Sequence, residues 1–191
     1  MRSIKQTALA FGRACGAANV EYVLIGGLAV MAWGQPRATM DVDALARLET
    51  KRIEALFLSC KGERLQFEVE DARDALRGEG HLTIFDLDSP YHVDVKVART
   101  VPEVLQVSSG VSVEFEEGIL HVASPEDTVA YKLLFGSPQD IADARSILVR
   151  QQARLDWATM LKTCVRLGVA KKLEGVLFEV GLREKLGPSH S

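Results

Sequence analysis

The stretch IGGLAVMAWGQPRATMDVDAL, residues 25–45, contains the features that decide the expected fold. An apolar segment breaks at Gly26 and Gly27, resumes over residues 28–33, and reaches Asp41 and Asp43 after a loop. Side chains two residues apart in a strand point to the same face, so a strand over 39–46 projects both carboxylates together. Two carboxylates on a strand that is otherwise apolar predict a metal site.

Composition places the chain among ordinary folded proteins. It has 191 residues, of which 47% are hydrophobic and 26% charged, which excludes a disordered chain and allows one substantial core. The three cysteines are scattered and odd in number, so they fit a reducing compartment and form no metal-ligand motif. No apolar window approaches the length of a membrane span. We therefore expect a cytoplasmic protein that does not use a membrane as partner.

Hydrophobic periodicity outlines the elements that surround this stretch. Helices are expected at 3–18, 28–33, 50–60 (with Thr50 as N-cap), 101–108 and 124–135, with three or four more after 138, and strands at 21–25, 39–46 and twice within 111–122. Residues 65–70 fit either a strand or the lead into a helix at 71–77. The segments HLTIFDLD and YHVDVKVA alternate on either side of Ser89-Pro90 and predict a β-hairpin.

These elements predict an α/β (α+β) fold with a small mixed β-sheet flanked by helices and a C-terminal helical region. We expect residues 1–123 to form the α/β core and residues 124–191 to form helices packed on it, as one structural unit. The helix at 124–135 has a clear start, because Ser124 fits the N-cap position and Pro125 the first helical position.

The second hairpin strand supplies a third carboxylate. His92, Asp94 and Lys96 share one face of this strand, and valines fill the other. If the strand pairs beside the strand of Asp41, three carboxylates converge, and such oxygen ligands suit Mg²⁺ or Mn²⁺. As alternatives, Asp41 and Asp43 could be turn or edge residues, and Asp94 could pair with Lys96 or Arg99. His92 is expected to be a surface residue of the hairpin.

The glycine pair predicts a phosphate site. A strand that ends in Gly26-Gly27 and opens a helix exposes backbone N–H groups at the helix N-terminus, where anions bind. Alone this signal is weak, but it becomes specific together with Asp41, Asp43 and the third aspartate, Asp94. Two ions held there would stabilise the attacking and leaving oxygens in phosphoryl or nucleotidyl transfer.

The stretch IGGLAVMAWGQPRATMDVD resembles the signature of the polymerase-β-like nucleotidyltransferase superfamily, a glycine turn followed by a short helix and Asp-x-Asp. The R-x-T-x-D-x-D form, which begins at Arg37, resembles the bacterial branch with the AbiEii-type abortive-infection toxins. The block ASPEDTVAYKLLFGSPQDIADA is similar to that branch's helical motif, with matches at Lys132, Asp140 and Asp143. The resemblance covers about residues 20–150.

This resemblance implies a Mg²⁺- or Mn²⁺-dependent transfer of a nucleoside monophosphate from an NTP to an acceptor. Asp41 and Asp43 would bind both ions, and Asp94 would bind one and assist deprotonation of the acceptor. Lys132 would neutralise phosphate charge. The remaining nucleotide contacts implied by the motif are Gly26, Gly27, Arg37, Thr39 and Asp140. The acceptor could be RNA such as a tRNA end, a protein or a small molecule, and a toxin with a cognate antitoxin is one version.

The sequence also departs from that branch. Members carry basic residues before Asp-x-x-Asp, whereas this chain reads Ser137-Pro138-Gln139. The alternative is therefore a catalytically inactive module of the same fold that binds or regulates. In that interpretation Lys132 lies on the exposed face of a helix, and Asp140 and Asp143 are first-turn acids that stabilise a helix N-terminus.

Overall fold

The structure is a computed structural model in which residues 1–186 are described. The chain divides into two compact units. The sheet unit comprises Met1–Leu28 and Ala38–Ala123, and the helical unit comprises Ala29–Arg37 and the chain from Ser124 onward. Whether the helical region packs on residues 1–123 as one structural unit stays a prediction. Within residues 1–186, no helix is both long and apolar enough to cross a membrane.

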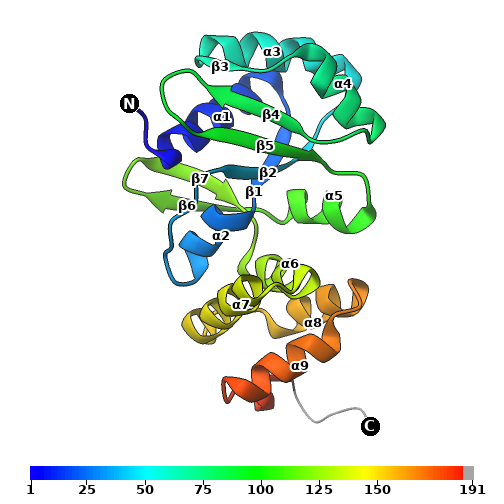
Figure 1. Ribbon diagram of the computed structural model, residues 1–191. Helices are drawn as coiled ribbons and strands as arrows, with labels where there is room; N and C mark the ends of the chain where they lie inside the picture. Colours follow the sequence, from blue (N-terminus) through cyan, green and yellow to red (C-terminus); the bar gives the residue numbers. More distant parts are fainter. Residues whose placement is uncertain (187–191) are drawn as a thin grey trace. The chain divides into compact units, whose positions relative to one another are not determined.

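A mixed sheet forms the centre of the sheet unit, with the strand order β3-β4-β5-β2-β1-β7-β6 (Figure 1). β2 pairs in parallel with β5, and β1 with β7, while the other neighbours are antiparallel. The strands are β1 (Glu21–Leu24), β2 (Val42–Arg47), β3 (Leu65–Gln66), β4 (Leu82–Asp86), β5 (His92–Val97), β6 (Val111–Phe115) and β7 (Gly118–Val122). The predicted mixed sheet and α/β class are confirmed.

Helix α1 (Ile4–Ala18) covers one face of this sheet, where it contacts β1, β2, β5 and β7. It begins with a capping box in which Ser3 accepts from the backbone of Gln6, and it ends at Asn19 in the left-handed conformation. Its apolar stripe includes the fully buried Phe11. Because β5 alternates, its valines at 93, 95 and 97 are buried while the residues between them face the other side.

Helix α5 (Val101–Ser108) packs on β1 and β2. It meets Lys96, which belongs to the same strand face as Asp94, through an ion pair of 2.7 Å between Lys96 Nζ and Glu103 Oε1. Burial opposes ionisation of Glu103, but hydrogen bonds from Lys96, Thr100 and Arg99 outweigh it and lower its pKa to about 2. Helix α5 therefore contacts the strand face that carries Asp94 at the position of Lys96.

The predicted β-hairpin is confirmed, since β4 and β5 pair antiparallel with Thr83 opposite Asp94. Both predictions for residues 65–77 have a counterpart, because β3 leads into α4 (Val69–Arg77). Thr50 as an N-cap is wrong: Thr50–Arg52 forms a 3₁₀ turn before α3 (Ile53–Gly62), so the chain tightens before the α-helix starts.

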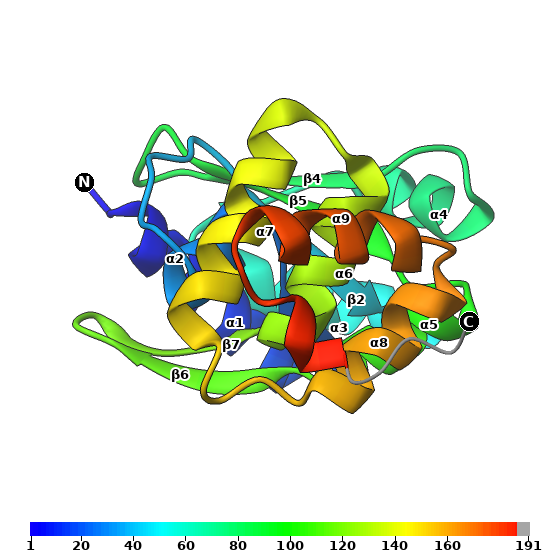
Figure 2. The ribbon, with the colours of Figure 1, turned by 90° about the horizontal axis from the view of Figure 1, so that it is seen from below.

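The helical unit is built around an apolar core that includes Val30, Leu133, Ile147 and Leu177. Figure 2 shows its helices, which are α6 (Pro125–Phe135), α7 (Pro138–Gln151), α8 (Trp157–Arg166) and α9 (Ala170–Glu179). The predicted cap of α6 is confirmed, because the Ser124 side chain accepts from the backbone N–H of Asp127. Helix α2 (Gly26–Trp33) begins in the sheet unit and ends in the helical unit.

Candidate functional site

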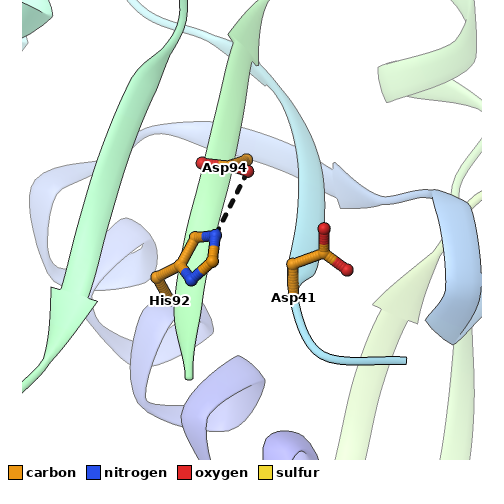
Figure 3. Close-up of side chains that lie close together, drawn as sticks. All are labelled: Asp41, His92 and Asp94. Atoms are coloured by element: carbon orange, nitrogen blue, oxygen red, sulfur yellow. Dashed lines mark ion pairs between the residues drawn. The ribbon is translucent and has the colours of Figure 1, made fainter. Parts of the chain in front are cut away.

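Two predicted carboxylates and one imidazole meet on the sheet unit (Figure 3). Asp41, His92 and Asp94 each offer a donor atom, and these atoms lie within 4.8 Å of one another. His92 and Asp94 occupy successive outward positions of β5, whereas Asp41 lies where the chain enters β2. The parallel pairing of β2 with β5 brings these segments together, as the sequence analysis required.

The strand of Asp41 starts later than expected. β2 begins at Val42, so Asp41 lies in the bend before it rather than within a strand over 39–46. The hydroxyl of Thr39 donates to Oδ1 of Asp41 at 3.1 Å. This contact fixes the carboxylate from within the loop, so Asp41 reaches His92 and Asp94 without being a ladder residue.

Asp43 lies beside Asp94 in the sheet, because the two residues are direct partners in the parallel register. It is not among the donors that gather within 4.8 Å. Its carboxylate instead lies against Gly26, where an added Cβ atom would be 2.0 Å from Oδ2 of Asp43. Gly26 has a φ of +58°, a left-handed conformation that glycine adopts without cost. The role of Asp43 as a metal ligand stays a prediction.

The second glycine allows a similar close approach. A Cβ atom at Gly27 would lie 2.6 Å from the hydroxyl oxygen of Thr39, the residue that holds Asp41. The helix starts at Gly26 rather than at residue 28, so both glycines belong to the first turn of α2. Their lack of side chains lets the loop with Thr39 and the strand with Asp43 close on the start of the helix.

Asp94 is held by its neighbours on the hairpin. The hydroxyl of Thr83 donates to its Oδ1 at 2.7 Å, and Nε2 of His92 lies 3.4 Å from its Oδ2. Nε2 of His81 is 3.8 Å from Oδ1. Among residues 1–186, neither Asp41 nor Asp94 forms an ion pair with a lysine or arginine. The site thus gathers acidic oxygens without a fixed cation, and its two carboxylates and imidazole fit a divalent ion.

The residues of the second motif form a separate cluster within the helical unit. Nζ of Lys132 lies 2.7 Å from Oδ1 of Asp140 and 3.0 Å from Oδ2 of Asp143. Arg37 donates to both oxygens of Asp143 at 3.1 Å. The Lys132 side chain is only 12% exposed, so the alternative that it lies on an exposed helix face is wrong. Its predicted role at a phosphate stays a prediction.

Residues 137–139 stand where basic residues were expected, and they form the start of α7. Ser137 and Asp140 form a capping box, and Pro138 occupies the first turn. The side chain of Gln139 donates to Asp143 at 2.9 Å. The alternative interpretation of Asp140 as an acid that stabilises a helix N-terminus therefore describes its contact with Ser137, but it leaves out the pairing with Lys132.

The sequence analysis did not assign two residues of this cluster, His92 and Thr83, to the site. His92 was expected to be a surface residue, although its position two residues before Asp94 already placed it on the same strand face. Thr83 could have been found only from the exact hairpin register, which alternation alone does not give.

No protein-family model matches this sequence, and no curated protein matches it. Solved structures do resemble it. An antigenic nucleotidyltransferase-like protein from Paracoccidioides brasiliensis has a TM-score of 0.55 at 16% identity, covering 93% of this chain and 94% of that one. The antibiotic-resistance factor ANT(2'')-Ia, solved with adenylyl-2''-tobramycin, has a TM-score of 0.53 at 14% identity, covering 86% of this chain and 99% of that one.

A candidate nucleotidyltransferase from H. pylori has a TM-score of 0.50 at 12% identity, with 95% of this chain and 93% of that one covered. At such identities a likeness of structure establishes the fold and not the activity. The mixed sheet, its flanking helices and the helices that follow are thus those of a nucleotidyltransferase-like fold.

Proposed function

We propose that this protein is a metal-dependent nucleotidyltransferase that moves a nucleoside monophosphate from an NTP to an acceptor. The observation that carries the proposal is the convergence of Asp41, His92 and Asp94 on a sheet of nucleotidyltransferase-like fold. Asp41 and Asp94 would hold a divalent ion, Mg²⁺ or Mn²⁺, and Asp43 would approach a second one from its place beside Asp94. When bound, such ions offset the negative charge of the triphosphate and of the leaving oxygen.

In the proposed reaction, a hydroxyl oxygen of the acceptor attacks the α-phosphorus of the NTP. The bond from that phosphorus to the oxygen bridging the α- and β-phosphates breaks, and pyrophosphate leaves with the electron pair. Asp94 accepts the proton of the acceptor, because its carboxylate is held by Thr83 yet its side chain remains 28% exposed. The chain thereby contributes alignment and a base.

The first turn of α2 is the proposed phosphate contact. Gly26 and Gly27 place backbone N–H groups of a helix N-terminus beside Asp43 and Thr39. Such groups favour phosphate oxygens through unpaired N–H donors and the helix dipole. Because both positions are glycines, Thr39 and Asp43 can approach the first turn closely. The glycines also present no side chain that would block a triphosphate.

The acceptor carries a hydroxyl group and is an RNA such as a tRNA end, a protein side chain or a small molecule. ANT(2'')-Ia, whose structure contains an adenylylated tobramycin, makes a small molecule one of the acceptors to test. A toxin that acts on RNA, as in the AbiEii-type branch that the Arg37–Asp43 motif resembles, is the other specific version. In that version a cognate antitoxin would be the partner.

A second candidate function is a catalytically inactive module with this fold. The ion pairs of Lys132 with Asp140 and Asp143 favour it, since a lysine expected at phosphate already has two carboxylate partners. Ser137, Pro138 and Gln139 stand where the related branch has cations, which further reduces the positive charge for a triphosphate.

Transfer of label from each α-labelled NTP separates these functions. The protein is incubated with Mg²⁺ or Mn²⁺ and with bulk tRNA, a panel of aminoglycosides or cell protein, and labelled product and pyrophosphate are quantified. Asp41→Asn should lower transfer by about 10³-fold, because one metal ligand is worth several kcal/mol in the transition state. Asp71→Asn, at an exposed position of α4, is the matched control. Transfer that survives in Asp41→Asn contradicts the proposal, and NTP binding without transfer favours the inactive module.

A further inference from the structure

The third donor of the candidate metal site is an imidazole rather than a carboxylate. We propose that His92 is a metal ligand alongside Asp41 and Asp94, and that this donor set makes the site select a first-row transition ion such as Mn²⁺ over Mg²⁺. The inference rests on the proposed function only insofar as both place a divalent ion at Asp41 and Asp94. It adds that the site prefers a transition ion such as Mn²⁺ and that His92 causes this preference.

The separations of the donor atoms suit one shared ion. Nε2 of His92 lies 3.4 Å from Oδ2 of Asp94, and all three donors lie within 4.8 Å of one another. Two ligands bound about 2.1 Å from one ion are about 3 Å apart when adjacent and about 4.2 Å apart when opposite. We infer that small side-chain rotations bring these donors onto one ion without a shift of β5 or of the bend before β2.

A neighbouring threonine hydroxyl group holds one carboxylate oxygen of each aspartate. Thr83 donates to Oδ1 of Asp94, and the other oxygen, Oδ2, is the one that faces His92. The hydroxyl of Thr39 donates to Oδ1 of Asp41. Partners of this kind fix the orientation of metal ligands and tune affinity. The arrangement thus presents two oxygens and one nitrogen from three directions.

Exposure leaves room for the rest of a coordination sphere. The side chain of His92 is 34% exposed and that of Asp94 is 28% exposed. Three protein donors leave further positions of a six-coordinate ion to water and to phosphate oxygens. Partial exposure also means that an ion can enter without local unfolding.

Ligand chemistry sets the preference. Mg²⁺ favours oxygen donors and gives up water reluctantly, whereas imidazole nitrogen suits transition ions. Affinity of a given nitrogen-containing site rises from Mn²⁺ through Co²⁺ in the divalent series. A site with three carboxylates discriminates less between Mn²⁺ and Mg²⁺. Replacement of the nitrogen donor should therefore weaken Mn²⁺ binding more than Mg²⁺ binding and so reduce the selectivity.

His81 is the matched control for His92. Its Nε2 lies 3.8 Å from Oδ1 of Asp94, yet its side chain is 64% exposed and it is outside the group of converging donors. A general effect of removing a histidine near Asp94 should appear in both variants. A ligand effect should appear only at His92.

The test measures binding of the ions rather than turnover. Mn²⁺ is titrated into the metal-free protein and free Mn²⁺ is followed by electron paramagnetic resonance, with Mg²⁺ and Co²⁺ as competitors, with and without a non-hydrolysable ATP analogue. Pulsed measurements on bound Mn²⁺ then detect coupling to ¹⁴N of an imidazole. Wild type, His92→Asn, His81→Asn and Asp41→Asn are compared after circular dichroism has shown that each is folded.

We expect Mn²⁺ to bind at least about tenfold more tightly than Mg²⁺, with a ¹⁴N coupling that His92→Asn removes and His81→Asn keeps. His92→Asn should weaken Mn²⁺ binding by about 10- to 100-fold and Mg²⁺ binding by less. An unchanged ratio in His92→Asn, a retained ¹⁴N signal, or no Mn²⁺ bound in either condition overturns the inference. Because label transfer supported by Mg²⁺ is measured separately, an active enzyme without selectivity would leave the proposed function standing.

Discussion

Two clusters of aspartates in this protein have opposite electrostatic surroundings. In the sheet unit, Asp41 and Asp94 face an imidazole and threonine hydroxyls, without a lysine or arginine ion pair among residues 1–186. In the helical unit, Asp140 and Asp143 share Lys132, and Arg37 adds two hydrogen bonds to Asp143. The first cluster could accept a divalent cation, whereas the second contains a lysine and an arginine of its own.

The pKa values of the second pair reflect this difference. Burial by itself would raise the pKa of Asp140 and Asp143, but hydrogen bonds from Lys132 and Ser137 to Asp140, and from Arg37, Gln139 and Lys132 to Asp143, lower both. A paired carboxylate stabilises the fold, while carboxylates grouped without a counter-charge repel one another. Aspartates therefore form structural ion pairs in the helical unit and a candidate metal site in the sheet unit.

The largest expected effect comes from breaking the paired cluster. Lys132→Met should lower the free energy of unfolding by about 3–5 kcal/mol, because two largely buried carboxylates would lose their shared cation. Urea unfolding at neutral pH measures the loss. Lys171→Met, at an exposed position of α9, is the control and should change stability by less than about 0.5 kcal/mol. Equal stability of both variants would show that the cluster contributes little.

The next effect tests how the candidate site is packed. Gly26→Ala should cost about 1–2 kcal/mol, because an alanine at a φ of +58° is strained and its Cβ atom would meet the carboxylate of Asp43. Label transfer should fall together with stability as Asp43 is displaced. Gly16→Ala is the control, because nothing lies within 4 Å of its added Cβ atom in α1. Retained activity in Gly26→Ala would separate Asp43 from the reaction.

A smaller effect of opposite sign is expected in the cluster of Asp41 and Asp94, which has no lysine or arginine ion pair among residues 1–186. In a chelator, Asp94→Asn should leave the free energy of unfolding unchanged or raise it by up to about 1 kcal/mol, since removing one charge relieves repulsion from Asp41. Excess Mn²⁺ should raise the melting temperature of the wild type and not of the variant. A clear loss of stability in chelator would mean that Asp94 is a structural residue.

The smallest expected effect is a change in how steeply the free energy of unfolding depends on pH. The lowered pKa values of Asp140 and Asp143 mean that the unfolded chain binds protons more readily, so their contribution is complete above the unfolded value of about 3.9. It is lost as the pH falls toward and through the folded values. Unfolding free energies measured below pH 5 should fall less steeply in Asp140→Asn than in the wild type. Lys171→Met should keep the wild-type slope, and an identical slope in Asp140→Asn would contradict the assignment.

Local patterns predicted much of this molecule. Alternation predicted the hairpin of β4 and β5, and Ser124 with Pro125 predicted the start of α6, because strand faces and helix caps depend on residues close in sequence. The same reasoning predicted that the aspartates at 41 and 94 lie close together, as they do. Thr50 failed as a cap because a 3₁₀ turn came before the helix, and sequence does not distinguish the two.

The sequence by itself determined which functional groups are present: a glycine turn, a pair of nearby aspartates and a third aspartate on an alternating strand. Only the tertiary structure decided which distant residues meet, because the parallel pairing of β2 with β5 brings Asp41 to His92 and Asp94 of β5, while Asp43 packs on Gly26. It also decided that Lys132 pairs with two aspartates, since helix packing and not sequence spacing sets that distance. Side-chain type is local, but the distance between side chains far apart in the chain belongs to the fold.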